Sequence, residues 1–355
     1  MVRPLLFLLD PEDVHDAALA LGGALASTAP SRAVIRTLLA HQNPALGQTI
    51  ASIRFANPVG LAAGFDKNAQ LAPLLEDIGF GFGEIGSITA DACPGNPRPR
   101  LWRLKKDRSL LVHYGLKSDG VDTIAAKLAR LRTTVPLGTN IARTNDRAAG
   151  ATTEAGIADY ARSYQRLATI GAFTVINISC PNAFCGYTFA DPDKLDALLR
   201  ALAAIKTSKP FFIKLSPDVS DQTLEALVAV GMRHGAAGFV CTNLTAQHPP
   251  HLTPDLAPSV GGISGKLLDR QSDRMIAAVY RLARGKAAVI GCGGIFSAQD
   301  AYRKIRLGAS LVELITGMIY QGPQLIGEIN AELAVLLRKD GFRSIADAVG
   351  ADNRS

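Results

Sequence analysis

From residue 57 onward, short apolar runs alternate with amphipathic helical patterns. Near-continuous apolar strands separated by helices are typical of a parallel sheet that is covered by helices. Eight such runs over roughly 260 residues favour a closed (β/α)8 TIM barrel over an open doubly wound sheet. The predicted strands are Pro58–Ala63, Phe82–Thr89, Leu137–Ile141, Phe173–Ser179, Pro210–Leu215, Gly238–Asn243, Ala288–Gly293 and Leu311–Thr316. The predicted helices between them include Asp159–Ile170, Asp193–Ile205, Asp221–His234, Asp269–Leu282 and Ala298–Leu307.

The first 45 residues follow a different pattern. The apolar run Pro4–Leu9 is too short to span a bilayer. Apolar positions at helical spacing then predict one helix over Val14–Leu25 and a second over Ser31–His41. Such a pair could lie on a membrane surface or form a helical cap over the core. We therefore divide the chain into an N-terminal helical extension (1–45), the barrel (46–340) and a C-terminal tail (341–355).

Composition excludes several classes of protein. Hydrophobic residues make up 48% and charged residues 19% of the chain, which rules out a disordered protein. The net charge of +7 comes from scattered basic residues, and a single Trp gives no stacking platform for nucleic acid. We expect no nucleic-acid partner. The five cysteines have no spacing typical of a disulfide framework or a zinc site, which indicates a reducing compartment and no metal.

Every predicted strand ends in polar residues or glycine. Barrel enzymes place their chemistry at the carboxyl ends of the strands, so these residues predict an active site there. The last two strands end in the glycine cluster Gly291–Gly294 and in Ile315–Gly317, which are suited to binding a phosphate. Lys214 lies in an apolar strand, where a lysine needs a specific role. A cation at this position could hold the negative charge of a reduced flavin.

Four segments resemble the dihydroorotate dehydrogenase family, and they follow one another in the family's order. They are Leu61–Lys67, Pro94–Leu101, Asn177–Asn182 and Gly291–Ile295. The resemblance implies an FMN-dependent TIM barrel that oxidises dihydroorotate to orotate in pyrimidine biosynthesis. The N-terminal helices resemble the quinone-using class 2 branch, in which they form an apolar tunnel to the flavin. This implies a quinone partner and a peripheral position on the cytoplasmic side of the cell membrane.

The resemblance also implies roles for individual residues. Cys180 is implied to be the catalytic base, and Lys67 to contact the carboxylate of a small anionic substrate. The implied FMN contacts are Ala63, Gly64, Lys67, Ser87, Asn140, Asn177, Lys214, Thr242, Gly265, Gly294, Ile315 and Thr316. The implied substrate contacts are Lys67, Val112, His113, Tyr114, Gly115, Leu116, Asn177, Asn182, Asn243 and Leu244.

Cys180 departs from the class 2 branch, whose members resemble one another in having Ser at the base position. Cys is the pattern of the soluble class 1 branch. A thiol has a reference pKa of about 8.5, so a fraction is thiolate near neutrality, whereas a Ser hydroxyl needs assistance. The alternative is that Cys180 is only a small buried apolar residue.

The substrate shell departs from the family as well. Val112 and His113 stand where the family has Asn and Arg, and Leu116 and Lys117 stand where it has Phe and Asn. Leu244 replaces a Thr or Ser. Each lost hydrogen bond to a polar ring costs roughly 1–3 kcal/mol. The chain could therefore be a divergent paralogue that oxidises a less polar carboxylate with the same FMN chemistry. A third hypothesis, an idle flavin-binding scaffold, is disfavoured by Lys67, Lys214 and Cys180.

Overall fold

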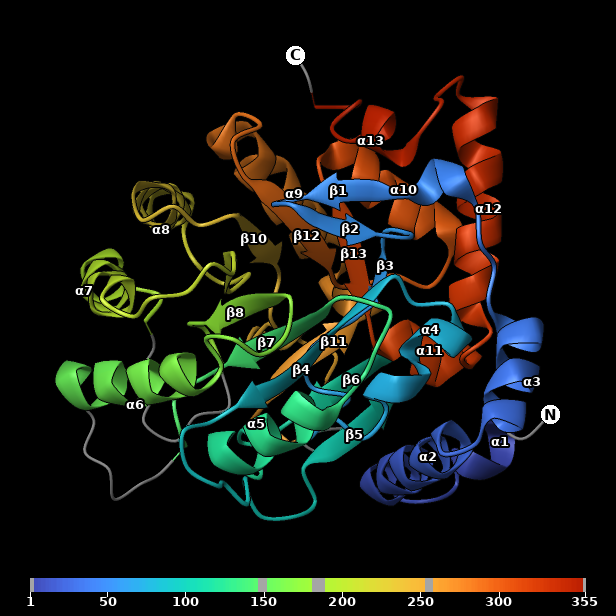
Figure 1. Ribbon diagram of the computed structural model, residues 1–355, viewed down its shortest axis with the longest axis horizontal. Helices are drawn as coiled ribbons and strands as arrows, with labels where there is room; N and C mark the ends of the chain where they lie inside the picture. The colour runs from blue at the N-terminus through green and yellow to red at the C-terminus, as the bar shows by residue number, and fades with distance from the viewer. Residues whose placement is uncertain (1–2, 146–151, 181–188, 253–257, 354–355) are drawn as a thin grey trace.

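The computed structural model describes residues 3–145, 152–180, 189–252 and 258–353. Eight parallel strands close into a barrel, in the order β3-β4-β7-β8-β9-β10-β12-β13 (Figure 1). The strands are β3 (Val59–Leu61), β4 (Phe82–Ile88), β7 (Leu137–Ile141), β8 (Phe173–Asn177), β9 (Phe211–Lys214), β10 (Gly238–Cys241), β12 (Ala288–Cys292) and β13 (Leu311–Leu314). The prediction of a (β/α)8 barrel is confirmed. Most strands end one or two residues before the predicted bound.

Helices cover the outside of the barrel, each with its apolar face inward. On α7, for example, Leu195, Leu198 and Leu202 are buried, and the Asp191 carboxylate caps the first turn by accepting from two backbone amides. The predicted start of α6 at Asp159 is wrong, because Thr152 caps the helix and starts it earlier. The surrounding helices are α5 (Val121–Arg130), α6 (Thr153–Arg166), α7 (Pro192–Ala203), α8 (Asp221–Arg233), α9 (Asp269–Ala283), α10 (Ala298–Leu307) and α12 (Leu325–Lys339).

Two small sheets were not predicted. The hairpin β1 (Gln48–Ile50) and β2 (Ile53–Phe55) brings the Phe55 ring within 5.6 Å of the Phe82 ring inside the barrel. A second sheet lies at the barrel mouth. It joins β5 (Leu101–Leu104), β6 (Ser109–Val112) and β11 (Gly262–Gly265) as antiparallel neighbours. The glycine-rich residues 262–265 form the strand β11 because they pair with β6.

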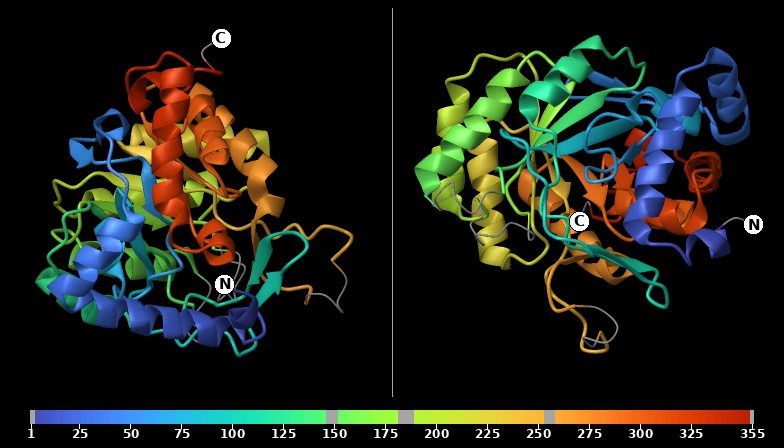
Figure 2. Two further views of the ribbon diagram at one scale, coloured as in Figure 1. Left: turned by 90° about the vertical axis from the view of Figure 1, so that its right-hand side faces the viewer. Right: turned by 90° about the horizontal axis from the view of Figure 1, so that it is seen from below.

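The predicted N-terminal helices are present as α2 (Pro11–Ala26) and α3 (Ala29–Leu39), preceded by α1 (Arg3–Leu6). They lie along one side of the molecule, beside β5 and α4 (Leu75–Ile78) (Figure 2). The buried Glu12 carboxylate accepts from Arg100 at 2.8 Å and links α2 to the segment just before β5. Asp77 accepts from Arg32 and Arg36 and fastens α3. Among the described residues, no single helix has the length and apolarity to cross a membrane; α2 and α3 meet that test only together and are bent by 114°.

The chain between α12 and residue 353 packs on the barrel. Ile345 and Ala348 of α13 (Ile345–Ala348) are fully buried, and the Asn353 amide donates to the carbonyls of Ala277 and Leu307. The division at residues 45 and 340 stays a prediction. The remaining short helices are η1 (Pro44–Leu46), η2 (Ala72–Leu74), α4 (Leu75–Ile78), η3 (Lys266–Leu268) and α11 (Thr316–Gln321).

Candidate active site

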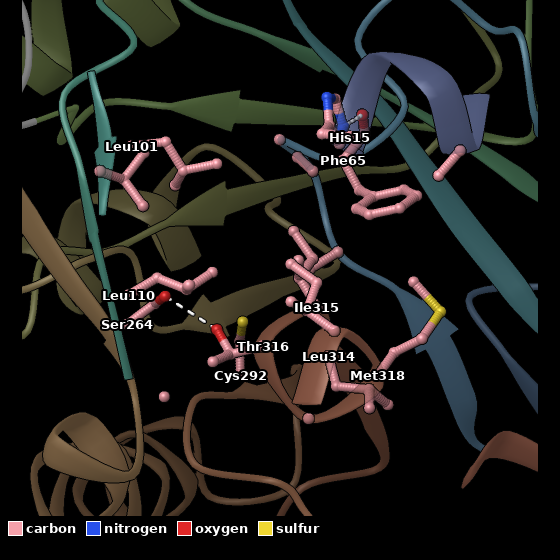
Figure 3. A pocket seen from close by; sticks show the side chains of 18 of the residues that line it. His15, Phe65, Leu101, Leu110, Ser264, Cys292, Leu314, Ile315, Thr316 and Met318 are labelled. Carbon is pink, nitrogen blue, oxygen red and sulfur yellow. Dashed lines mark hydrogen bonds between the residues drawn. The ribbon is translucent and has the colours of Figure 1, made fainter. Parts of the chain in front are cut away.

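A cavity of about 830 Å³ extends from the carboxyl ends of the barrel strands to the inner faces of α2 and α3. Figure 3 shows its two ends: Ser264 and Thr316 lie at the barrel end, and His15 and Phe65 lie beside α2. Between them the wall is apolar and includes Leu101, which projects from β5. Polar groups at one end and an apolar passage at the other suit a polar cofactor and an apolar second ligand.

Glycines leave backbone uncovered at the barrel end. Gly294 has φ +75°, and a Cβ atom there would lie 2.4 Å from a carboxylate oxygen of Asp269. Gly265 has φ +96°, and its Cβ atom would lie 2.6 Å from the carbonyl oxygen of Arg108. Only glycine fits at both positions, since L-residues with a side chain avoid this region. The neighbouring hydroxyls of Ser264 and Thr316 are 2.8 Å apart. This group of small and hydroxyl residues fits a phosphate.

A chain of side-chain hydrogen bonds crosses the barrel mouth. The Ser87 hydroxyl donates to the Asn140 carbonyl at 2.6 Å, and the Asn177 amide donates to Ser87 at 3.0 Å. The Asn243 amide donates to the Asn177 carbonyl at 3.0 Å. Ser87, Asn177 and Asn243 line the cavity. Asn140 is fully buried below them, and its amide donates to Glu84.

Lys214 lies inside the barrel and lines the cavity floor. Its ammonium group is 2.9 Å from Glu313 and 3.7 Å from Glu84, and both carboxyl groups are fully buried. Burial alone would lower the pKa of Lys214, but the charges of Glu313 and Glu84 outweigh that effect and raise it. Lys214 therefore holds a permanent positive charge below the cavity.

Lys67 lies on the loop that follows β3. The Asp66 carboxylate accepts from the backbone amides of Gln70, Leu71 and Ala72 and so fixes this loop. The Lys67 ammonium lies 4.0 Å above the centre of the Tyr114 ring. Burial and the nearby charge of Lys117 lower the pKa of Lys67 to about 8. A cation in so poorly hydrated a place is suited to binding an anion.

The structure brings most of the other predicted residues to the same cavity. They are Ala63, Gly64, Val112, Tyr114, Gly115, Leu116, Cys180, Thr242, Leu244 and Ile315. Cys180 lies three residues beyond β8 and is half-buried. The His113 imidazole lies outside the cavity lining, with Nε2 3.0 Å from the Asn96 amide nitrogen. Asn182 lies outside the described residues.

Sequence reasoning missed three residues at this site. His15 of α2 reaches the cavity, and its Nε2 donates to the Phe65 carbonyl at 2.9 Å. Burial and the charge of Lys67 lower the pKa of His15 to about 4, so its ring is neutral. Glu84 and Glu313 lie in apolar strands, as Lys214 does. A charged residue in an apolar strand needs a specific role, so the sequence could have identified both glutamates in the same way as Lys214.

Comparisons with known proteins agree with this geometry. The family model described as "Dihydroorotate dehydrogenase" matches residues 45–337. The chain is 38% identical over 361 residues to a protein of Rhodospirillum rubrum, covering 99% of this chain and 94% of that one. It is 41% identical over 360 residues to one of Roseiflexus sp., covering 99% and 97%. Both relatives are named "Dihydroorotate dehydrogenase (quinone)".

Solved structures give the same result. The dihydroorotate dehydrogenase of Eimeria tenella in complex with ferulenol is 31% identical and superposes with a TM-score of 0.86, covering 98% of this chain and 96% of that one. Its ligand-free form has a TM-score of 0.87 at the same identity and covers 98% and 100%. The chain therefore belongs to the dihydroorotate dehydrogenase family, in its quinone-using class 2 branch.

Proposed function

We propose that this protein oxidises dihydroorotate to orotate, with FMN bound at the barrel mouth and a quinone as the electron acceptor. The observation that carries the proposal is the single cavity that joins the barrel mouth to the N-terminal helices. FMN, when bound, would take two electrons from the substrate and pass them to the quinone. Names of the relatives support the same pair of substrates.

The FMN phosphate would lie against Gly265, Gly294 and Thr316, where the backbone is uncovered. Ser87, Asn177 and Thr242 would contact the ring system across the barrel mouth, with Lys214 below it. Asn140 would act on the cofactor through Ser87, since it lies below the cavity lining.

The substrate would lie between Lys67 and Cys180. The Lys67 ammonium would bind the carboxylate of dihydroorotate, and the Cys180 thiolate would remove the proton next to a carbonyl group. Such a proton is acidified by that carbonyl, so a modest base suffices. Asn177 and Asn243 would hydrogen-bond the polar ring, and Asn182 remains a proposed contact.

The quinone would enter along the apolar wall beside α2. The neutral imidazole of His15 and the side chains of Leu25 and Leu101 line this part of the cavity. Leu8 and Leu38 are 78% and 74% exposed on the same N-terminal segment. Exposed leucines on the segment whose Phe7 and Leu39 line an apolar passage support a peripheral position on the cytoplasmic face of the cell membrane, where quinones dissolve.

A specific observation favours a second candidate, the oxidation of a less polar carboxylate. Val112, Leu116 and Leu244 line the cavity together with Lys67. The Asn243 amide already donates to Asn177 and to Ser179. These protein partners occupy hydrogen-bond donors that could otherwise bind a polar substrate ring. A site with fewer polar partners accepts an apolar ring at a lower desolvation cost.

One experiment tests the proposal and separates the two candidates. The purified protein is expected to be yellow and to release FMN, not FAD, on denaturation. Dihydroorotate added without oxygen should bleach the flavin absorbance within seconds. Bound FMN that dihydroorotate leaves oxidised would favour the second candidate, and a protein that cannot be loaded with FMN would refute both.

A further inference from the structure

One layer of the barrel interior, directly below the cavity, holds four titratable side chains. They are Glu84 of β4, Lys214 of β9, Cys292 of β12 and Glu313 of β13. Lys214 and Cys292 line the cavity floor, and Figure 3 shows Cys292 close to Thr316. Glu84 and Glu313 are fully buried beneath it. Buried carboxylates need partners, and two glutamates share one lysine here.

The arrangement leaves one oxygen of each carboxyl group without a donor. Glu313 Oε1 accepts from Lys214 at 2.9 Å, and Glu84 Oε2 accepts from the Asn140 amide at 2.8 Å. Glu84 Oε1 and Glu313 Oε2 are buried and accept no hydrogen bond from any described residue. The two carboxyl groups lie close together, because Glu313 Oε1 and Glu84 Oε2 are 2.9 Å and 3.7 Å from the same Lys214 ammonium group. A single proton shared between them would satisfy both oxygens.

Charge favours the same shared proton. Two carboxylates this close in a buried site do not both ionise readily. Burial and the charge of Glu313 raise the pKa of Glu84 to about 8, a value that belongs to the pair. Burial and Glu313 also raise the pKa of the Cys292 thiol, so that group stays protonated. With Lys214 protonated, one proton on the pair makes the layer electrically neutral near pH 7.

We propose that Glu84 and Glu313 form a proton-binding site whose occupancy is coupled to the redox state of FMN in the cavity above it. This inference rests on the proposed FMN site. Negative charge added above Lys214 by reduction competes with Glu313 for the lysine. The ionised carboxyl groups lose part of their stabilisation, and the pair binds a proton more tightly.

The proton and electron balance closes over one turnover. Dihydroorotate supplies two electrons, and the quinone removes them. The proton on the carboxyl pair comes from water during reduction and returns to water on reoxidation. Where the pH is low enough for the carboxyl pair to be protonated in the oxidised protein, the pair binds no further proton when FMN is reduced. At a higher pH, the pair binds one proton when FMN is reduced.

The midpoint potential of bound FMN, measured by spectroelectrochemistry from pH 6.5 to 9.5, tests the proposal. Each proton coupled to a two-electron reduction changes the potential by about 30 mV per pH unit, because a tenfold change in the equilibrium corresponds to that value. Lys214 would keep the reduced ring anionic, so the cofactor itself would bind one proton for each two-electron reduction. We therefore expect the midpoint potential to change by about 30 mV per pH unit at low pH. Above a break near pH 8, the pair adds a second proton and the slope should be about 60 mV per unit.

Three variants identify the group responsible. Lys67 lines the same cavity and also titrates near pH 8, so the variants are compared in a Lys67→Arg background, where the guanidinium stays protonated. There Glu313→Gln and Glu84→Gln each remove the shared proton, so the slope should stay near 30 mV per unit throughout. Cys292→Ala removes the thiol of the same layer and should keep the break. FMN content is measured for each protein, and either glutamine variant alone suffices if the other does not bind FMN. A straight line for the unmodified protein, or a break that survives in a glutamine variant, would overturn the proposal. Absence of FMN from the unmodified protein would instead contradict the proposed function.

Discussion

At the scale of single residues, the pKa of Lys67 gives the site a pH dependence. Its value of about 8 lies below that of a lysine in water, because burial and Lys117 disfavour the charged form. The ammonium form, which attracts a carboxylate, therefore predominates below pH 8 and is lost above it. We expect the dissociation constant of orotate, measured from the flavin absorbance, to rise about tenfold per pH unit above pH 8.

Lys67→Arg is the matched variant for this prediction. A guanidinium group stays protonated across the range, so the rise above pH 8 should vanish even if binding is weaker overall. Lys67→Met should weaken orotate binding below pH 8, where the lysine is charged, and should also remove the rise above pH 8. Orotate affinity of the unmodified protein that is constant up to pH 9.5 would show that Lys67 does not bind the carboxylate.

Cys180 is the second residue with a chemical role to test. Cys180→Ala should nearly abolish flavin reduction by dihydroorotate while FMN stays bound, because the proposed cofactor contacts lie elsewhere. Cys180→Ser should keep partial activity with a pH optimum moved upward, since a hydroxyl is harder to deprotonate than a thiol. Stopped-flow absorbance measures both rates. Wild-type rates after Cys180→Ala would mean that the thiol is only packing.

Val112 and Leu244 determine how polar the substrate pocket is. Val112→Asn combined with Leu244→Thr should raise kcat/KM for dihydroorotate by up to about tenfold for each hydrogen bond of roughly 1.4 kcal/mol regained. The control is Val335→Asn on the exposed face of α12, which should change nothing. If the unmodified protein already has a micromolar KM and an ordinary turnover, Lys117 or ordered water replaces those contacts.

At the scale of elements, local patterns predicted the barrel and missed the sheet at its mouth. All eight barrel strands are short, mostly apolar segments, and helices separate them. The strand β11 gives no such pattern, because its sequence is Gly262-Ile263-Ser264-Gly265 and it is held by pairing with Ser109–Val112. Pairing between segments that lie so far apart in the chain is invisible to a reading of periodicity.

The site was predictable to the extent that its residues follow barrel strands. Lys214, Ser87 and Thr242 come from strand ends, which meet at one face of any such barrel. His15 comes from α2, and nothing in its local sequence places that helix over the cavity. His113 follows the last residue of β6, and the direction of its side chain depends on how that strand pairs. The sequence therefore could not show that the His113 side chain lies outside the cavity.

The N-terminal helices also predict where the protein binds a surface. Leu8 and Leu38 are exposed large apolar residues, each next in sequence to a residue that lines the cavity, and their burial in a bilayer would stabilise attachment. Leu8→Gln with Leu38→Gln should reduce flotation with anionic lipid vesicles, while turnover with a short-chain quinone in detergent stays unchanged. Val335→Gln on α12 is the control and should float as the unmodified protein does. Equal flotation of all three would argue that the helices are a structural cap.

At the scale of the whole molecule, the central claim is that both half-reactions use one cavity. Ala18 of α2 lines that cavity, whereas Ala17 is exposed on the same helix and does not. A tryptophan at position 18 would fill the passage beside α2 and leave the barrel mouth open. The same substitution at position 17 would face solvent.

Stopped-flow absorbance can follow the two half-reactions separately in Ala18→Trp, with Ala17→Trp as the control. We expect dihydroorotate to reduce the flavin of both variants at the wild-type rate. We expect quinone to reoxidise the Ala18→Trp flavin at least about tenfold more slowly, a difference of roughly 1.4 kcal/mol in barrier, and the control flavin at the wild-type rate. Unimpaired reoxidation of Ala18→Trp would show that the quinone reaches the flavin by another route.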